Sequence, residues 1–75
     1  MIFMTIGQKI KEYRESKKMS QSALAKALNV SRQAVNLWER NRAVPRITKL
    51  LILKNIFGCD INDILVNTNN VILVK

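Results

Sequence analysis

The sequence predicts a small all-α domain, a bundle of five short helices, and three observations support this fold class. Apolar residues recur at spacings of three and four through most of the chain, which is the period of an amphipathic helix. Residues that can cap a helix through a hydroxyl group, Thr5, Ser20 and Ser31, stand directly before three of these periodic stretches. The chain has 75 residues, only two glycines and one proline, and is 48% hydrophobic, so we expect a single folded domain over residues 1–75.

The first two helices are predicted over residues 5–17 and about 21–28. Asn29 and Val30 then make a tight connection to Ser31, and two short helices joined by three or four residues have the spacing of a helix-turn-helix unit. A small residue, Ala25, faces the neighbouring helix and allows a close approach. The predicted inward positions of these two helices are Ile6, Ile10, Tyr13, Leu24, Ala25 and Leu28.

The third periodic stretch is SRQAVNLWERN at residues 31–41. We expect the rest of the chain to hold this stretch at the surface. Val35 and Trp38 fall on one side of a helix over residues 31–40, and a polar face falls on the other. Arginine and glutamine in its first turn can each make two hydrogen bonds to a base edge in the major groove of DNA. We interpret this stretch as a candidate recognition helix whose outward residues are Arg32, Gln33, Asn36 and Leu37.

The C-terminal third predicts two more helices and an apolar tail. Pro45 can begin a helix but cannot continue one, and the fourth helix is expected over residues 46–57, ended by Gly58. A short fifth helix follows over residues 60–65. Residues 67–75 form a tail whose apolar part, together with residues 1–4, is strand-length, and we expect these two ends to pair as a small β element within one chain or across a dimer. The apolar residues whose spacing predicts the fourth helix are Ile47, Leu50, Leu51, Leu53 and Phe57.

The charge of the chain favours a polyanionic partner. Thirteen Lys and Arg against five Asp and Glu give a formal net charge of +8, and only Lys75 among the basic residues lies beyond Lys54. On charge alone, nucleic acid, an anionic membrane and a merely solvated basic surface are all open. A membrane is disfavoured because basic and apolar residues are spread over five capped helices instead of along one long amphipathic helix.

Catalytic and metal-binding chemistry have little support in the composition. The chain has no histidine, a single cysteine, Cys59, no carboxylate pair on a shared face and no glycine-rich phosphate loop. We therefore expect no enzyme activity, no cofactor, no metal and no small-molecule ligand. A lone cysteine, an apolar start too short for a signal peptide and the absence of any run of 18 apolar residues lead us to expect a cytoplasmic protein.

On these residues the chain resembles the phage-repressor type of helix-turn-helix protein, the Cro and C1 class of the Xre family. The resemblance covers residues 6–65 and is carried by Arg14, by MSQSALAKALNVSRQAVNLWERN at residues 19–41, by Pro45 and by GCDINDIL at residues 58–65. It implies a five-helix bundle of the lambda-repressor-like type, with the helix-turn-helix unit at about residues 20–41. It also implies a homodimer that binds double-stranded DNA on a near-palindromic operator.

The resemblance assigns roles to individual residues. Arg14 and Glu39 match two positions that form an ion pair beneath the helix-turn-helix unit, and Gln21 matches a glutamine that contacts phosphate and braces the recognition helix. The structural alternative for Gln21 is simple helix capping. The alternative for the outward residues of the helix over residues 31–40 is a solvated helix face. The implied base-contacting residues are Arg32, Gln33, Asn36 and Leu37, and the implied phosphate-contacting residues are Gln21, Ser31, Arg40, Asn41 and Arg42.

The chain departs from the family pattern at three places. Lys18 and Asn41 stand where glycine is frequent, which predicts a left-handed backbone and some strain at Lys18. Lys54 replaces a small inward residue, so its stem must reach out to solvent or the fourth helix must be rotated. Ile52 and Ile56 occupy positions that are normally polar, and an apolar pair on an outer helix face is a candidate interface.

These apolar positions predict a homodimer. Together with Val71 and Leu73 in the tail, Ile52 and Ile56 would form its interface, whereas the alternative is that the tail only covers its own core. The function that we expect is a sequence-specific DNA-binding transcriptional regulator, acting as a repressor. The alternative function is a protein-interaction module, an antitoxin or a repressor antagonist, that uses the apolar surface of Ile52, Ile56 and the tail.

Overall fold

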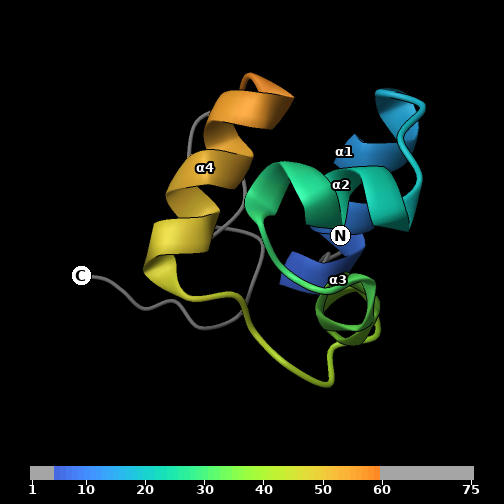
Figure 1. Ribbon diagram of the computed structural model, residues 1–75, viewed down its shortest axis with the longest axis vertical. Coiled ribbons are helices and arrows are strands. Elements are labelled where there is room, and N and C mark those ends of the chain that lie inside the picture. The colour runs from blue at the N-terminus through green and yellow to red at the C-terminus, as the bar shows by residue number, and fades with distance from the viewer. Residues whose placement is uncertain (1–4, 60–75) are drawn as a thin grey trace, which may run out of the picture.

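The computed structural model describes residues 5–59, and within this range the chain is helical and contains no strand (Figure 1). The helices are α1 (Ile6–Ser16), α2 (Gln21–Leu28), α3 (Arg32–Glu39) and α4 (Ile47–Phe57). The bounds of these four helices agree with the bounds predicted from the sequence to within a residue or two. The expected fifth helix at residues 60–65, the tail at residues 67–75 and the paired termini lie outside the described residues and stay predictions.

The first three helices begin where the sequence places their caps. The Thr5 hydroxyl accepts from the backbone N–H of Gln8 at 3.1 Å, and the Gln8 side chain accepts from the backbone N–H of Thr5 at 2.8 Å, which completes a capping box. Ser20 and Ser31 each accept from the backbone N–H three residues later, at 3.0 and 3.1 Å. Local hydrogen bonds therefore define these three starts without help from the rest of the fold.

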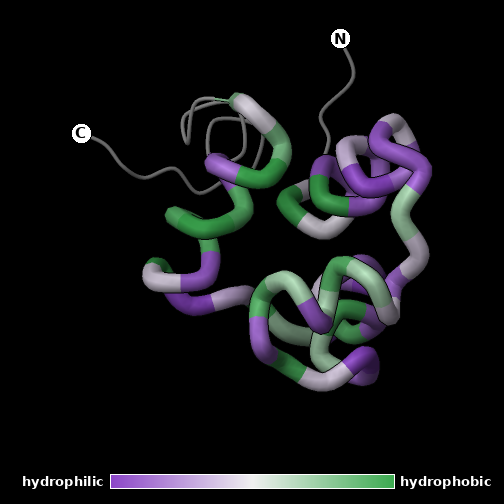
Figure 2. Tube along the Cα trace, turned by 45° about the horizontal axis from the view of Figure 1, so that its top comes forward, coloured by the Kyte–Doolittle hydropathy of each residue, from purple (hydrophilic) through white to green (hydrophobic). Residues whose placement is uncertain are grey.

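The core lies where the four helices meet. In Figure 1, α2 packs against α3, α1 packs on α3, and α4 stands to one side against α2. Figure 2 shows hydrophilic and hydrophobic residues interspersed along the described helices, with a longer hydrophobic run in α4. The side chains with no appreciable exposure are Ile10, Leu24, Leu28, Val35 and Leu53.

Helix α4 buries only part of its apolar pattern. Leu50, Leu53 and Phe57 are buried, but Ile47 is 57% exposed and Leu51 is 44% exposed. A helix turns about 100° per residue, which carries Leu51 away from the face that its neighbour Leu50 buries. At the other end of the helix Phe57 stacks on the half-buried Tyr13, with 5.2 Å between ring centroids, and so ties α4 to α1.

Four residues adopt left-handed backbone conformations and end or connect helices. Lys18 and Asn41 have φ of 58° and 61°, as the sequence predicted. Asn29 ends α2 with φ of 59°, and Gly58 ends α4 with φ of 69°. Because lysine has a Cβ and no short polar side chain to bond locally, Lys18 is the residue among these four whose conformation is strained.

Two long-range contacts fix the helices in ways that the sequence did not reveal. Gly7 in the first turn of α1 lies so close to the end of α3 that a Cβ there would collide with the carbonyl oxygen of Trp38. Its N–H donates to the Asn41 side-chain oxygen at 3.3 Å. On the other side of the bundle, the Lys49 ammonium donates to the carbonyl of Leu28 at 2.9 Å, so α4 satisfies a free carbonyl at the end of α2.

Among the described helices none has the length and apolar character needed to cross a lipid bilayer.

Candidate nucleic-acid interface

Helix α3 divides its residues between the core and the surface as the sequence predicted. Val35 is fully buried and Trp38 is 6% exposed, so this side of the helix is fixed against α1 and α2. On the opposite side, Arg32 and Gln33 are exposed in the first turn. Asn36 and Leu37, one turn further along, are half-buried. The four residues assigned to base contact therefore lie on the side of α3 opposite Val35 and Trp38, two of them exposed and two half-buried.

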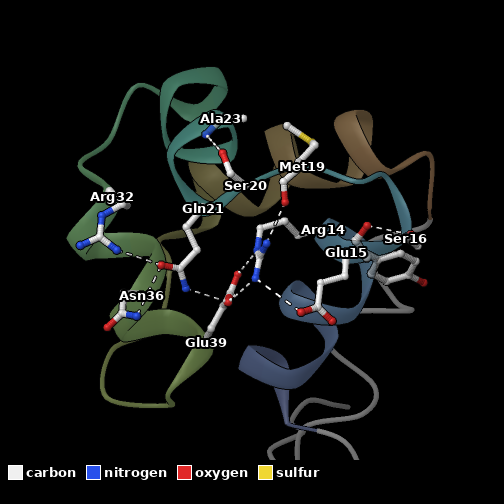
Figure 3. Close-up of polar contacts among 11 residues, drawn as sticks. Arg14, Glu15, Ser16, Met19, Ser20, Gln21, Ala23, Arg32, Asn36 and Glu39 are labelled. Atoms are coloured by element: carbon white, nitrogen blue, oxygen red, sulfur yellow. Dashed lines mark hydrogen bonds and ion pairs between the residues drawn. The ribbon is translucent and has the colours of Figure 1, made fainter.

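Gln21, the first residue of α2, links α2 to both ends of α3. Its Nε2 donates to Glu39 Oε1 at 3.0 Å, and its Oε1 accepts from Arg32 Nη1 at 3.2 Å (Figure 3). A longer contact, 3.5 Å, joins Asn36 Nδ2 to the same oxygen. Gln21, which is assigned to phosphate contact, thus also contacts Arg32 and Asn36, which are assigned to base contact. These contacts fit the bracing role that the resemblance implied and go beyond simple capping.

The ion pair of Arg14 and Glu39 lies directly behind this contact. Arg14 Nε is 2.6 Å from Glu39 Oε2, and Nη2 is 3.1 Å from Oε1, so the guanidinium makes two parallel hydrogen bonds to the carboxylate. The side chains are only 11% and 3% exposed. Arg14 Nη1 also donates to the carbonyl of Met19 at 2.7 Å, in the connection that leads to α2. The pair therefore joins α1, the connection to α2 and the end of α3 at one buried point.

This environment keeps Arg14 charged. The hydrogen bond that Arg14 donates to Glu39 raises the pKa of Arg14, burial acts in the opposite direction, and the negative charges of Glu39 and Glu15 raise the pKa further. A raised pKa in the folded state means that the stabilisation is complete below the ordinary guanidinium range and is lost only as the pH rises through it. Arg14 consequently stays charged across the whole neutral range.

The turn after α3 carries three of the five residues assigned to phosphate contact. Arg40, Asn41 and Arg42 are all exposed there, and the backbone N–H of Arg42 closes the turn by donating to the carbonyl of Leu37 at 2.8 Å. Asn41 has a structural task as well, because its side-chain oxygen accepts from Gly7. Ser31 uses its oxygen as the N-cap of α3. Its hydroxyl proton stays available as a donor.

The residues assigned to a dimer interface are only partly described. Ile52 is 38% exposed, whereas Ile56 is half-buried and packs against the core, and Val71 and Leu73 lie outside the described residues. Three exposed hydrophobic side chains that the sequence analysis did not assign to an interface lie near the start of α4. They are Val44, Ile47 and Leu51, which are 69%, 57% and 44% exposed.

Three functional or structural contacts escaped sequence reasoning altogether. They are the link from Gln21 to Glu39, the contact of Gly7 with the end of α3, and the bond from Lys49 to Leu28. Each joins residues at least eighteen positions apart, and no local pattern in the sequence marks such a pair.

Comparison with known proteins agrees with this geometry. A family model described as "Helix-turn-helix" matches residues 10–64. The HTH-type transcriptional regulator DicA of Escherichia coli is 38% identical over 56 residues, which cover 75% of this chain and 42% of DicA. The HTH-type transcriptional activator BcrR of Enterococcus faecalis is 31% identical over 62 residues, which cover 83% of this chain and 30% of BcrR.

Among solved structures, the P22 c2 repressor in complex with a synthetic operator superposes with a TM-score of 0.77 and 31% identity. The match covers 81% of this chain and 92% of the repressor chain. The fold of the described residues is thus that of a helix-turn-helix domain, which this chain shares with transcriptional regulators. The chain belongs to the helix-turn-helix family of the Xre and Cro/C1 type. It spans less than half of the length of the curated relatives that it matches.

Proposed function

We propose that this chain represses transcription by binding a two-fold DNA operator as a homodimer, with α3 of each copy in the major groove. The observation that carries the proposal is the free face of α3. Its first turn exposes Arg32 and Gln33, while its opposite face is fixed by buried Val35 and Trp38. A rigid helix that presents forked donors on one side is what readout of base edges requires.

The proposed contacts divide into two classes. Arg32 and Gln33, assisted by Asn36 and Leu37, would discriminate between base pairs. Gln21, Ser31, Arg40, Asn41 and Arg42 would grip phosphates and hold the register without reading sequence. The net charge of +8 would add a salt-dependent attraction common to all DNA sequences. Repression would follow from occupancy of a promoter.

The same proposal includes the organisation of the whole chain. Residues 6–65 would form the repressor-like core, completed by a fifth helix at residues 60–65, with a β element formed by the two ends. The chain would be cytoplasmic and without enzyme activity. The helix-turn-helix match at residues 10–64 supports the repressor-like core. The fifth helix and the β element rest on the sequence pattern alone.

The dimer part of the proposal is supported by exposed apolar surface. Ile52 is exposed on α4, and we propose that it acts with Ile56, Val71 and Leu73 in an interface between two copies. Light scattering at tens of micromolar should give the mass of two chains. A mass of one chain at that concentration, with operator binding intact, would contradict the dimer and leave the DNA proposal standing.

Selection from a pool of random duplexes tests the proposed function as a whole. The wild-type chain should enrich duplexes that carry two related half-sites about 10 base pairs apart, because a two-fold dimer places its recognition helices about one helical turn apart. Enrichment of no sequence above the starting pool would contradict sequence-specific binding.

The second candidate is a protein-interaction module, an antitoxin or a repressor antagonist. The exposed hydrophobic side chains of α4, Ile47, Leu51 and Ile52, are the observation in its favour. The intact polar face of α3 favours the DNA proposal instead, since a module that does not bind DNA has no use for it. A chain that binds no duplex in the selection and forms no homodimer would favour this second candidate.

A further inference from the structure

The Gln21 amide is nearly saturated with hydrogen bonds in the free protein. A glutamine side chain offers two N–H donors and an oxygen with two acceptor sites. One donor is used by Glu39, and the oxygen accepts from Arg32 and, at 3.5 Å, from Asn36 (Figure 3). One N–H is left, which is the kind of group that a DNA phosphate would accept from.

Only one orientation of this amide fits its surroundings. Turned by 180°, it would bring its oxygen against the Glu39 carboxylate and its NH₂ against the donors of Arg32 and Asn36. The hydrogen bonds of Gln21 to Glu39, Arg32 and Asn36 would be lost. Repulsion between two acceptors, and between donors, would replace them. The negative charge of Glu39 therefore decides that Gln21 turns its N–H to Glu39 and its acceptor oxygen to Arg32 and Asn36.

Glu39 is itself held in place from the other side. Its two oxygens accept from Nε and Nη2 of Arg14, and its side chain is 3% exposed. Arg14 has a third bond to the backbone of Met19. A continuous row of contacts consequently runs from the buried ion pair through Gln21 to the exposed Arg32 (Figure 3).

We propose that Glu39, through the Gln21 amide, positions Arg32 and Asn36 for base recognition. Glu39 is a positioning residue: it is the last residue of α3, its side chain is only 3% exposed, and it acts on DNA only through Gln21. This inference rests on the proposed function, because it concerns how that function obtains its sequence preference. It also makes the ion pair with Arg14 part of the recognition apparatus in addition to part of the core.

The first experiment compares Glu39→Gln with Glu12→Gln. Both variants replace one glutamate by its neutral isostere, but Glu12 is an exposed residue of α1, with a 59% exposed side chain.

The measurement is discrimination between base pairs. Arg32→Ala first identifies the base pair that Arg32 reads in a duplex selected by the wild type. The affinities of Glu39→Gln and Glu12→Gln for duplexes with each of the four base pairs at that position are then measured. Glu39→Gln should reduce discrimination by about tenfold, since a good side-chain contact to a base supplies roughly 5- to 150-fold. Affinity for random duplex should match that of Glu12→Gln within about twofold. Equal discrimination in the two variants, at a temperature where both are folded, would overturn the proposal.

A second variant and a measurement without DNA keep the test decisive if Glu39→Gln does not fold. Gln21→Met preserves the length of the side chain and leaves the Arg14–Glu39 pair intact, but it cannot accept from Arg32. Side-chain NMR relaxation of Arg32 in the free 75-residue chain should show restricted motion in the wild type and in Glu12→Gln, and greater motion in Gln21→Met. Equal mobility of Arg32 in the wild type and in Gln21→Met would overturn the proposal. This result is independent of whether the wild type selects any duplex, so failure of the proposed function and failure of the positioning link are distinguishable.

Discussion

Arg14 Nε lies 2.6 Å from Glu39 Oε2, and this contact joins two residues that are 25 positions apart in the chain. The carboxylate is 3% exposed, and it accepts from Gln21 as well as from Arg14. A buried carboxylate with several donors is stabilising only while its partners remain, because an unpaired charge in the interior has lost its hydration. The same small group therefore supports the core and the first turn of the candidate recognition helix.

Removal of Arg14 should be strongly destabilising. We expect Arg14→Ala to lower the free energy of unfolding by about 3 to 5 kcal/mol, because it leaves Glu39 buried without its cation. Urea denaturation monitored by circular dichroism measures the loss. Lys11→Ala, an exposed position on the same helix, is the control and should change stability by less than about 0.5 kcal/mol.

The loss of stability in Arg14→Ala should not depend on pH between neutral and mildly basic solution. The pKa of Arg14 is raised in the folded state by its hydrogen bond to Glu39, so its contribution is complete below the guanidinium range. The loss in Arg14→Ala should therefore be the same at pH 7 and at pH 9. A loss below about 1 kcal/mol at either pH, which is typical of an exposed pair, would contradict a buried ion pair.

Replacement of Lys18 by glycine should stabilise the domain. Lys18 is exposed and has φ of 58°, a conformation that costs a residue with a Cβ about 1 kcal/mol and costs glycine almost nothing. We expect Lys18→Gly to raise the free energy of unfolding by about that amount. The neighbouring Lys17, with φ of −92°, is the matched control, and Lys17→Gly should give no gain. Equal effects of the two substitutions would argue against strain at Lys18.

Gly7 should not tolerate a methyl group. Alanine is the better helix former by about 1 kcal/mol, yet a Cβ at Gly7 collides with the carbonyl oxygen of Trp38 and would stand 2.7 Å from the Asn41 side-chain oxygen. We expect Gly7→Ala to destabilise the domain by about 2 kcal/mol or more, because α1 must move away from α3. At Gly58 nothing lies within 4 Å of a Cβ, so Gly58→Ala should cost only the roughly 1 kcal/mol of its left-handed φ. Thermal melts of the two variants compare these effects, and a milder effect at Gly7 than at Gly58 would contradict the close approach.

Lys49 should contribute to stability although it is a lysine near the surface. Its ammonium donates to the Leu28 carbonyl at 2.9 Å, at the end of α2 where backbone acceptors have no helical partner. Lys49→Met keeps the apolar stem and should cost about 1 to 2 kcal/mol. Lys26→Met, on an exposed position of α2, removes the same charge without a bond and should be nearly neutral. Matching urea midpoints for these two variants would show that the Lys49 bond contributes nothing.

The helices of this domain could be predicted from the sequence because their signals are local. Thr5, Ser20 and Ser31 cap from positions directly before the periodic stretches, and Gly58 ends α4 directly after one. The polar side of α3 followed from the spacing of Val35 and Trp38 alone. In each case the residues that decide the structure lie within one or two turns of each other.

The contacts between helices could not be predicted in the same way. The apolar residues of α4 outnumber the positions that one face can bury, so the sequence could not tell that Leu50 would be inside and Leu51 outside. Gly7 has an ordinary helical role unless the end of α3 is known to lie against it. The bond from Gln21 to Glu39 likewise depends on how α2 and α3 are packed.

The central claim is that the free face of α3 reads DNA sequence, and fluorescence anisotropy of a labelled duplex tests it most directly. The duplex is taken from the region upstream of the gene or from the selection, and excess unlabelled random duplex is present at two salt concentrations. The wild type should bind through the competitor and weaken steeply with salt. Arg32→Ala with Gln33→Ala should lose its preference for the duplex by at least about tenfold while binding random DNA nearly as well as Lys11→Ala does. A preference that survives in the double variant, or a wild type that the random duplex displaces completely from every selected sequence, would contradict the claim.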